Sequence, residues 1–363
     1  LIWVDGSPAS HCAARIEGRY RPVMEHVVAE VYRRFAELEA AGVSQSYFEW
    51  ATAIADDDEV LALISALPRI KRQPNLVFAA ARFVGSPVGA YPPFREWLMS
   101  HWDAVTAVIL NRSTQTNEAG RCAVLLPVLA RLEGPLALIE VGASAGLVLY
   151  PDRYSYSYRA GDDIVRLDPA AGASQVECPC IIDAASVPSR LPDVAWRAGV
   201  DLHPIDVRDA DALAWLETLI WPEHDVRRER LHAAARIVAD DPPQLLQGDL
   251  IERIPELVAA APTGARIVVF HSAVLVYLTP ERRAQFADLM AGMPNVTWIS
   301  NEGAGVLPAV DAQLTTATNG RMILAVDGVP VALVGPHGQS FERIGGLHPE
   351  DEVFARLTRT HRE

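Results

Sequence analysis

Residues 135–149 read PLALIEVGASAGLVL, and this stretch decides the fold. Its first half is apolar except for Glu140 and predicts a buried strand. The small residues from Gly142 to Gly146 then predict a tight turn that leads into the first turn of a helix. A helix N-terminus presents unpaired N–H groups, so we expect an anionic or hydrogen-bonding ligand at this turn.

Three enzyme classes use a strand and glycine-rich turn of this kind. Dinucleotide-binding enzymes carry GxGxxG, which the four-residue spacing of Gly142 and Gly146 does not match. Hydrolases of the α/β class carry GxSxG, which residues 142–146 do match, with Ser144 as the nucleophile. Class I S-adenosylmethionine-dependent methyltransferases carry an acidic residue two positions before the turn. Glu140 and the turn resemble that motif, with Ser144 in place of its middle glycine.

The sequence ahead of the turn favours the methyltransferase class. In α/β-hydrolases several strands and a loop rich in His and Gly precede the serine, whereas the chain before Leu136 predicts helices. Two alternatives stay open. One is a catalytically inactive binding or regulatory module. The other is a serine hydrolase, whose triad would be completed by a later acid and a later imidazole: Asp311 or Asp327, and His337 or His348.

The composition of the chain limits the classes of binding partner that we expect. The net charge of -14 argues against a nucleic-acid-binding protein, because phosphate neutralisation needs a basic surface. No apolar run approaches the roughly 18 residues that span a bilayer, and nothing indicates secretion. The few cysteines fit neither a disulfide framework nor a metal site. We therefore expect a cytoplasmic protein with a small-molecule substrate, no membrane association and no metal; the oligomeric state is not predicted.

The chain divides into three parts by its periodicity. Residues 1–20 show none and contain the cleavage-site-like sequence IEGR, so we treat them as a ragged or vector-derived start. Residues 21–132 predict an all-helical N-terminal domain that acts as a lid. Its first helix has an apolar stripe formed by Met24, Val27, Val28, Val31, Phe35 and Leu38. Residues 133–363 predict a seven-stranded methyltransferase-like domain, with a small antiparallel β insertion at about 154–192.

Four stretches carry a resemblance to a known family. They are RQPN at 72–75, TQTNE at 114–118, EVGASAGL at 140–147 and DRY at 152–154. Together they resemble an uncharacterised bacterial domain-of-unknown-function family that is class I methyltransferase-like, over most of the chain from about residue 24. The resemblance implies an α/β, Rossmann-like sheet that is mostly parallel with an antiparallel last strand. It also implies S-adenosylmethionine as the cofactor, but no particular substrate.

Residues at predicted strand ends are the candidate cofactor ligands. In class I methyltransferases an acid at the end of the second strand binds the ribose, a part that Asp201 fits first and Asp206 second; a turn or helix-cap aspartate is the alternative. Asp249, in a Gly-Asp pair after the third strand, would meet the adenine. Asn117 and Arg121 lead into the first strand, with helix capping as the alternative. The full set of candidates is Glu140, Gly142, Ser144, Gly146, Asp201, Asp206, Asp249, Asn117 and Arg121.

The apolar run 267–270 predicts a further strand that ends at His271. Ligands in open α/β sheets bind beyond the carboxyl ends of the strands, so His271 is a candidate general base and Tyr277 a second candidate. A histidine hydrogen-bonded into the strand end is the alternative. The pattern around Asp327-Gly328 predicts a hairpin, which resembles the antiparallel last strand of methyltransferases. We expect direct methyl transfer to a small, partly apolar nucleophile, driven by alignment and exclusion of water.

Overall fold

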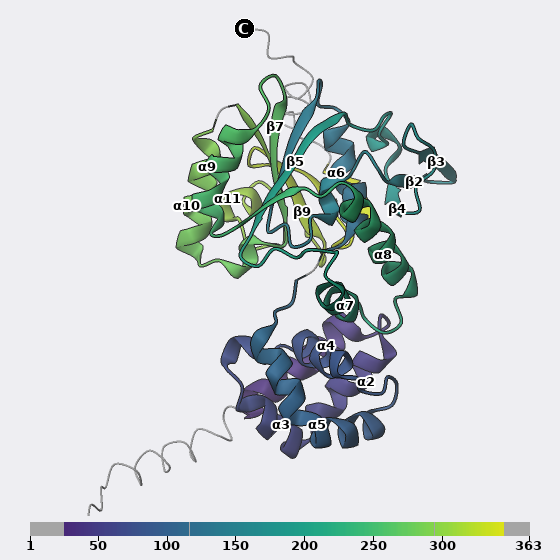
Figure 1. The fold of residues 1–363 in the computed structure, drawn as a ribbon, viewed down its shortest axis with the longest axis vertical. Coiled ribbons are helices and arrows are strands. Elements are labelled where there is room, and N and C mark those ends of the chain that lie inside the picture. The colour runs from purple at the N-terminus through teal and green to yellow at the C-terminus, as the bar shows by residue number, and fades with distance from the viewer. Residues whose placement is uncertain (1–24, 116, 294, 345–363) are drawn as a thin grey trace, which may run out of the picture. The chain divides into compact units, whose positions relative to one another are not determined.

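The computed structural model describes residues 25–115, 117–293 and 295–344, and the chain forms two compact units (Figure 1). The first unit contains the chain up to Thr116 together with Ala214–Asp225. The second contains Asn117–Leu213 and the chain from Val226 onward. The residues predicted as a ragged start, 1–20, lie outside the described ranges, as does His348.

The first unit is helical, as the sequence predicts. It comprises a helix over residues 25–35 that continues into η1 (Ala36–Ala40), α2 (Gln45–Ile54), α3 (Asp58–Ser65), η2 (Arg69–Lys71), α4 (Pro74–Val84) and α5 (Tyr91–Asn111). Side-chain caps set two of the starts: Ser44 accepts a hydrogen bond from the main chain at the start of α2, and Asp57 does so at α3. Aromatic side chains fill the core, where the rings of Trp50 and Phe94 stack 3.8 Å apart.

The predicted apolar stripe of the first helix is only partly correct. Val28 and Phe35 are buried, but Val27, Val31 and Leu38 are exposed. The buried face instead continues through small and aromatic side chains, which are Ala29, Tyr32 and Ala36. The periodicity therefore identified the helix, while the choice of face depended on packing against neighbouring helices.

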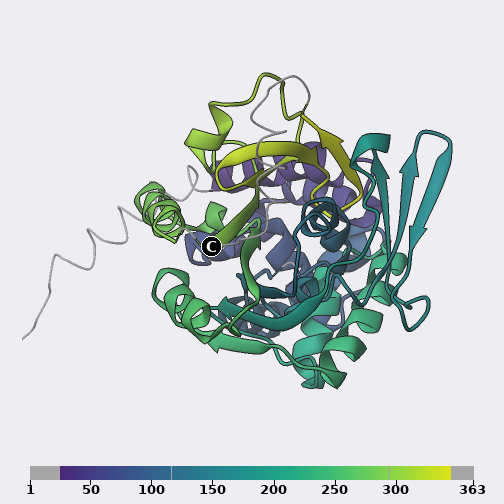
Figure 2. The ribbon, with the colours of Figure 1, turned by 90° about the horizontal axis from the view of Figure 1, so that it is seen from above.

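The second unit contains an 11-stranded sheet instead of the predicted seven strands, and Figure 2 shows it from above. Its strand order is β3-β2-β4-β11-β10-β9-β8-β7-β1-β5-β6. The strands are β1 (Leu136–Val141), β2 (Ser155–Ala160), β3 (Asp163–Leu167), β4 (Glu177–Ile182), β5 (Val194–Asp201), β6 (Gln244–Gln247), β7 (Arg266–Ser272), β8 (Val296–Glu302), β9 (Met322–Val326), β10 (Val329–Val334) and β11 (Ser340–Arg343).

Helices cover both faces of this sheet. The helices and helical turns of this unit are η3 (Ala119–Arg121), α6 (Cys122–Leu129), η4 (Leu147–Leu149), η5 (Ala184–Ser186), α8 (Asp225–Asp240), α9 (Leu250–Ala260), η6 (Leu275–Tyr277), α10 (Pro280–Ala291) and α11 (Pro308–Asp311). α7 (Ala210–Leu219) is divided between the two units, and its residues from Ala214 onward belong to the first. Figure 1 shows α9 and α10 on one side of the sheet and α6 and α8 on the other. Leu257 of α9 and Phe286 of α10 pack with Ile139 and Val269 in one core cluster.

The central strands place the candidate site. β1 lies between β5 and β7, and β6 and β8 extend this parallel section on either side. All six residues of β1 are buried, as expected for a strand covered on both faces. Val141 pairs with Val200 on one side and His271 on the other, so the carboxyl ends of these strands meet at one edge. The predicted α/β fold with a mostly parallel sheet is confirmed.

The structure corrects the helix expected after the glycine turn. The turn leads only into η4, a single 3-10 turn, and the chain then enters β2. Leu147 to Tyr150 are buried on all sides and Pro151 cannot donate a main-chain hydrogen bond, which opposes a longer helix. The link from β1 to β5 therefore contains strands instead of an α-helix.

The predicted insertion and hairpin are present in altered form. β2 pairs antiparallel with β3, but it pairs parallel with β4, and β4 pairs parallel with β11, so the insertion joins the main sheet. The turn between β9 and β10 has positive φ at Asp327 (49°) and Gly328 (79°), as a tight hairpin turn requires. The antiparallel neighbour of β8 is β9, the first strand of the hairpin. β10 and β11 lie beyond it.

Candidate functional site

The glycine turn after β1 has a strained, closely packed main chain. Gly142 and Gly146 have φ values of 69° and 71°, and Ser144 has 49°, which side-chain-bearing residues seldom adopt. A Cβ on Gly142 would lie 2.5 Å from Cγ2 of Val274. A Cβ on Gly146 would lie 3.0 Å from Cγ of Pro243. Both glycines are therefore required by conformation and by space.

Asn117 holds this turn from one side. Its side-chain amide donates to the carbonyl of Ala143 at 2.9 Å and accepts a hydrogen bond from the N–H of Leu147, also at 2.9 Å. The placement of Asn117 beside the turn agrees with the sequence analysis. Neither contact is the N-terminal helix cap considered as the alternative, because Asn117 joins two points of a turn that is remote in sequence.

Asp201, at the end of β5, holds the turn from the other side. Its Oδ2 accepts the main-chain N–H of Ser144 at 2.8 Å, and its Oδ1 accepts the N–H of His203 at 2.8 Å. The N–H groups of Gly142 and Ala143 donate to the carbonyl of Val200. The N–H groups of Gly142, Ala143 and Ser144 therefore already donate to the protein, whereas the sequence led us to expect unpaired N–H groups at this turn.

A pocket of about 280 Å³ lies next to the turn, on the side of β5 and β6. Ala145 of the turn forms part of its wall, Leu245 of β6 another part, and the loop of residues 204–208 a third. Its polar groups include Asp206 and Arg208, which form an exposed ion pair with an N–O distance of 2.8 Å. Hydrogen bonds from Arg208 hold the pKa of Asp206 below its usual range.

Asp249 lies apart from that pocket's lining. Its Oδ1 accepts the N–H of Ile251 at 2.9 Å and caps α9, while its Oδ2 pairs with Arg282. Both oxygens thus have partners within the protein, and in the structure Asp249 acts as the N-cap of α9.

Glu140 is a buried acid beneath the turn. Only 5% of its surface is exposed, and its Oε2 accepts no hydrogen bond from a described residue. Burial raises the pKa of Glu140 well above its usual value; the guanidinium of Arg121 opposes this shift and Asp201 adds to it. Folding therefore favours the protonated form of Glu140 more than the unfolded chain does.

Arg121 ties three segments together at this edge. It is buried, and it donates to the carbonyl of Pro336 from Nε at 3.0 Å and to the carbonyl of Ser272 from Nη1 at 3.1 Å. Ser272 ends β7, so this contact brings the candidate Arg121 next to the strand end that carries His271.

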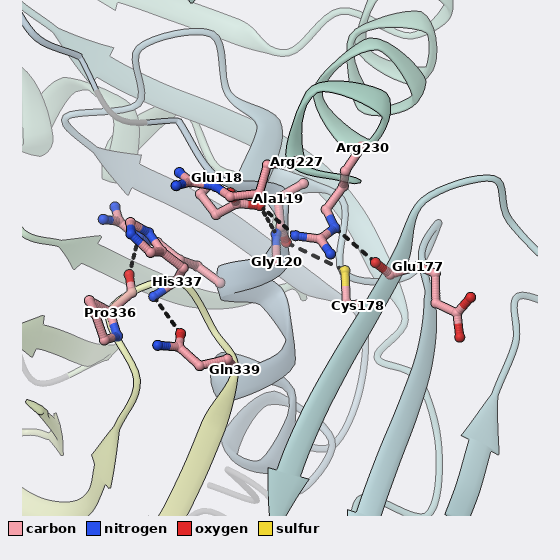
Figure 3. A network of polar contacts seen from close by, with 11 residues as sticks. Glu118, Ala119, Gly120, Glu177, Cys178, Arg227, Arg230, Pro336, His337 and Gln339 are labelled. Atoms are coloured by element: carbon pink, nitrogen blue, oxygen red, sulfur yellow. Dashed lines mark hydrogen bonds and ion pairs between the residues drawn. The ribbon is translucent and has the colours of Figure 1, made fainter. Parts of the chain in front are cut away.

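A charged cluster next to Arg121 was not anticipated (Figure 3). Glu118 is buried and binds two arginines of α8, with 2.6 Å to Nε of Arg227 and 3.1 Å to Nη1 of Arg230. The N–H of Gly120 donates to the same carboxylate at 3.0 Å. Burial alone would raise the pKa of Glu118, but the two arginines outweigh it and the pKa is lowered. The i, i+3 spacing of the arginines is the signal that could have indicated a shared partner.

His271 is fully buried and uses both ring nitrogens. Trp298 donates from its Nε1 to Nε2 of His271 at 3.0 Å. An indole nitrogen can only donate, so the imidazole proton lies on Nδ1 and is donated to Oε1 of Glu302 at 2.7 Å. The structure thus agrees with the alternative of a histidine hydrogen-bonded into its strand end. Tyr277 lies in η6 with 71% of its surface exposed.

Glu302 also binds the main chain of the segment that covers the turn. Its Oε1 also accepts the main-chain N–H groups of Val274 at 2.9 Å and Leu275 at 3.0 Å. Burial would raise its pKa, but the hydrogen bond from His271 and those from the main chain hold the pKa of Glu302 below its usual range. Val274 is the side chain that closes the space over Gly142, so Glu302 fixes the cover of the glycine turn.

The described residues do not assemble a serine-hydrolase triad. The hydroxyl of Ser144 is buried and has no hydrogen-bond partner among them. Asp327 accepts the N–H of Trp298 at 2.8 Å, and Asp311 accepts that of Gly305 at 2.8 Å. The main-chain N–H of His337 donates to Gln339 in the network of Figure 3.

The described residues contain no group of three or more His, Cys, Asp or Glu side chains that could hold a metal ion. They also contain no helix that is both long and apolar enough to cross a membrane.

Fold and site together define an α/β protein whose glycine turn lies at the carboxyl edge of a mostly parallel sheet. Residues 29–343 match the model of a family described as "Uncharacterized protein conserved in bacteria (DUF2332)". The chain belongs to that family, which confirms the family part of the predicted resemblance. Neither curated proteins nor solved structures gave a match.

Proposed function

We propose that the second unit binds S-adenosylmethionine and transfers its methyl group to a small-molecule nucleophile. One observation carries the proposal. The carboxylate of Asp201 contacts the main chain of Ser144, so an acid at the end of β5 lies against the glycine turn at the end of its neighbour β1. A 280 Å³ pocket lies beside this pair.

The strand order supports the same proposal. From β6 through β5 and β1 to β7 and β8 the strands are parallel, and the chain passes from one side of β1 to the other between β6 and β7. Open α/β sheets bind ligands at such a switch point, outside the carboxyl ends of the strands. The turn, Asp201 and the end of β7 all lie at this edge.

The residues present fit the cofactor in part. The pocket has apolar walls from Val207, Val238 and Leu245 for a base, and Asp206 at its exposed side for hydroxyl groups. Its volume is slightly below the roughly 300–1,000 Å³ usual for ligand pockets, which suits a nucleoside better than the whole cofactor. The methionine part would lie along the turn.

Unpartnered oxygens near the turn fit the amino-acid part of the cofactor. The Oε2 of Glu140 and the hydroxyl of Ser144 are buried and accept no hydrogen bond from a described residue. Such atoms are stabilised by a donor such as an ammonium group. When bound, S-adenosylmethionine supplies an electrophilic methyl group, and the protein's part is to align the acceptor and exclude water.

In this proposal His271 has a positioning role. Because both ring nitrogens have partners, the imidazole holds Glu302, and Glu302 holds the main chain of Val274 over the turn. A proton that the methyl acceptor loses would pass to solvent or to another group near the acceptor, and not to His271. The dependence of turnover on alignment is therefore expected to exceed its dependence on a protein base.

The test is calorimetric titration with S-adenosylhomocysteine. We expect saturable 1:1 binding, weakened by about tenfold or more in Asp201→Asn, which keeps the side-chain shape and loses one acceptor. Asp288→Asn, on the exposed surface of α10, is the matched control and should bind like the parent protein. A folded protein that takes up no S-adenosylhomocysteine at millimolar concentration contradicts the proposal.

One observation favours a second function. Ser144 matches the central position of GxSxG and has a left-handed main chain directly after a buried strand, as a nucleophile elbow does. A fluorophosphonate probe separates the two functions. Covalent labelling that is lost in Ser144→Ala would identify a hydrolase, whereas the methyltransferase proposal predicts no labelling at this residue.

A further inference from the structure

A second, much smaller pocket lies at the carboxyl end of β8. Its volume is about 10 Å³, which is roughly the space that one water-sized particle needs. Three of its lining residues are polar, Ser300, Glu302 and Asp311, and the rest of the wall is Gly303, Leu307, Val310 and Ile323. It lies wholly within the second unit.

Two carboxylate oxygens at this pocket lack a donor. Oε1 of Glu302 and Oδ2 of Asp311 accept hydrogen bonds from the protein. The other oxygen of each carboxylate, Oε2 of Glu302 and Oδ1 of Asp311, is buried and accepts none from a described residue. Only 3% of the surface of Glu302 is exposed, so bulk water does not solvate its second oxygen.

The charge around this pocket is not neutralised by its hydrogen bonds. Glu302 is bonded to the Nδ1–H of His271, whose Nε2 accepts from Trp298, so this imidazole brings no positive charge. Among the described residues, neither Glu302 nor Asp311 forms an ion pair within 4.0 Å with a lysine or arginine, and the buried guanidinium of Arg121 acts on Glu302 only through space. Both carboxylates line this small pocket, and a cation bound in it would be attracted to their negative charge.

We propose that this pocket binds a small monovalent cation between Oε2 of Glu302 and Oδ1 of Asp311. A divalent ion is disfavoured because it prefers six or more oxygen ligands with more acidic groups, and the described residues contain no cluster of three such metal-binding side chains. The size of the pocket admits sodium, potassium or ammonium, and excludes tetramethylammonium.

The cation would stabilise the cover of the glycine turn. Glu302 holds Val274 and Leu275 through its other oxygen, and Val274 closes the space over Gly142. A ligand that fixes the Glu302 carboxylate therefore also fixes this segment. The inference concerns a separate pocket and does not depend on the proposed methyltransferase activity.

The experiment compares thermal unfolding of the protein in sodium, potassium, ammonium and tetramethylammonium chloride, each at about 100 mM. At least one small cation should raise the unfolding midpoint by roughly 2–4 °C above its value in tetramethylammonium chloride. In Asp311→Asn, which can still accept from Gly305, the difference should disappear. In the surface control Asp288→Asn it should remain.

Crystallography with a heavier monovalent cation locates the ion. Crystals grown with rubidium or thallium should give an anomalous peak between Glu302 and Asp311. Equal midpoints in all four salts, a cation effect retained in Asp311→Asn, or a peak-free site holding only water would each overturn the proposal.

Discussion

Asp201 accepts the main-chain N–H of Ser144 at 2.8 Å, and this bond joins the ends of two adjacent parallel strands. The acid predicted to bind a ribose thus also supports the turn predicted to bind the rest of the cofactor. Support and binding are compatible, because a carboxylate oxygen can accept more than one hydrogen bond. Stability and ligand affinity are therefore expected to change together when Asp201 is replaced.

Asp201→Asn should lower the free energy of unfolding by about 1–3 kcal/mol, because an amide group replaces one of two accepting oxygens. Denaturation in urea measures the change. The control Asp288→Asn should lie within about 0.5 kcal/mol of the parent protein, as exposed substitutions usually do. Equal stability of the two variants would mean that the Ser144 contact contributes nothing.

Glu140 should make the protein less stable as the pH rises. Its pKa is raised in the folded state by burial, so the unfolded chain releases this proton at a lower pH than the folded chain does. The stabilising contribution of protonated Glu140 is complete below its pKa in the unfolded chain. It is lost as the pH rises toward its pKa in the folded protein. Glu140→Gln removes this loss, and its stability relative to the parent should increase with pH above about 4.

Unfolding free energies of parent and Glu140→Gln at several pH values provide the measurement. A relative stability of the variant that falls with rising pH would show that Arg121 holds Glu140 ionised, against the direction given by its burial. The far-ultraviolet spectra of both proteins should coincide, since glutamine keeps the shape of the side chain.

The features that sequence predicted best are local ones. The run from Leu136 to Val141 identified a buried strand, and Asp327-Gly328 identified a hairpin, because each depends on neighbouring residues. Asn117 was placed beside the turn because its segment leads into β1. These predictions needed no information about distant packing.

The features that sequence missed depend on long-range contacts. Whether the turn continues as a helix was decided by the burial of Leu147 to Tyr150 and by Pro151. The pairing of β4 with β11, about 160 residues later in the chain, has no local signal. The arginine partners of Glu118 lie more than 100 residues away in the sequence. From its position at a strand end, His271 was predicted to be a general base. The hydrogen bonds of its two ring nitrogens depend on Trp298 and Glu302, which lie about 30 residues later in the sequence.

Gly142→Ala should destabilise the protein through two separable effects. A positive φ of 69° costs a side-chain-bearing residue about 1–2 kcal/mol, and the new Cβ would lie 2.5 Å from Val274. A double-mutant cycle with Val274→Ala separates them, because the smaller side chain removes the clash and leaves the strain. Additive effects of the two substitutions would exclude the predicted contact.

Trp298→Phe should cost about 1–3 kcal/mol of stability, because it leaves the buried Nε2 of His271 without a donor. Nitrogen NMR of the parent protein should identify the Nδ1–H tautomer of His271, as the direction of the two hydrogen bonds requires. An Nε2–H tautomer would contradict the assignment, since it cannot accept from the indole.

Glu118→Gln should be among the most destabilising single substitutions in the second unit. It leaves Arg227 and Arg230 without their carboxylate, and loss of one partner of a buried ion cluster costs about 3–5 kcal/mol when no water replaces it. The two arginine side chains are 19% and 11% exposed, so partial hydration places the expected loss near the lower end of that range. Glu229→Gln, at an exposed position of α8 between the two arginines, is the control.

The pH dependence of this loss distinguishes charge from shape. The pKa of Glu118 is lower in the folded protein than in the unfolded chain. Its contribution to the free energy of unfolding is therefore present above the unfolded pKa and is lost as the pH falls through the folded pKa. This pH dependence is the reverse of that expected for Glu140. The difference between parent and Glu118→Gln should therefore be largest near neutral pH and shrink below about pH 4. A pH-independent difference would mean that the carboxylate acts only as a hydrogen-bond acceptor for Gly120. Adding Arg230→Met to Glu118→Gln should restore part of the stability, because it removes one unpaired buried charge.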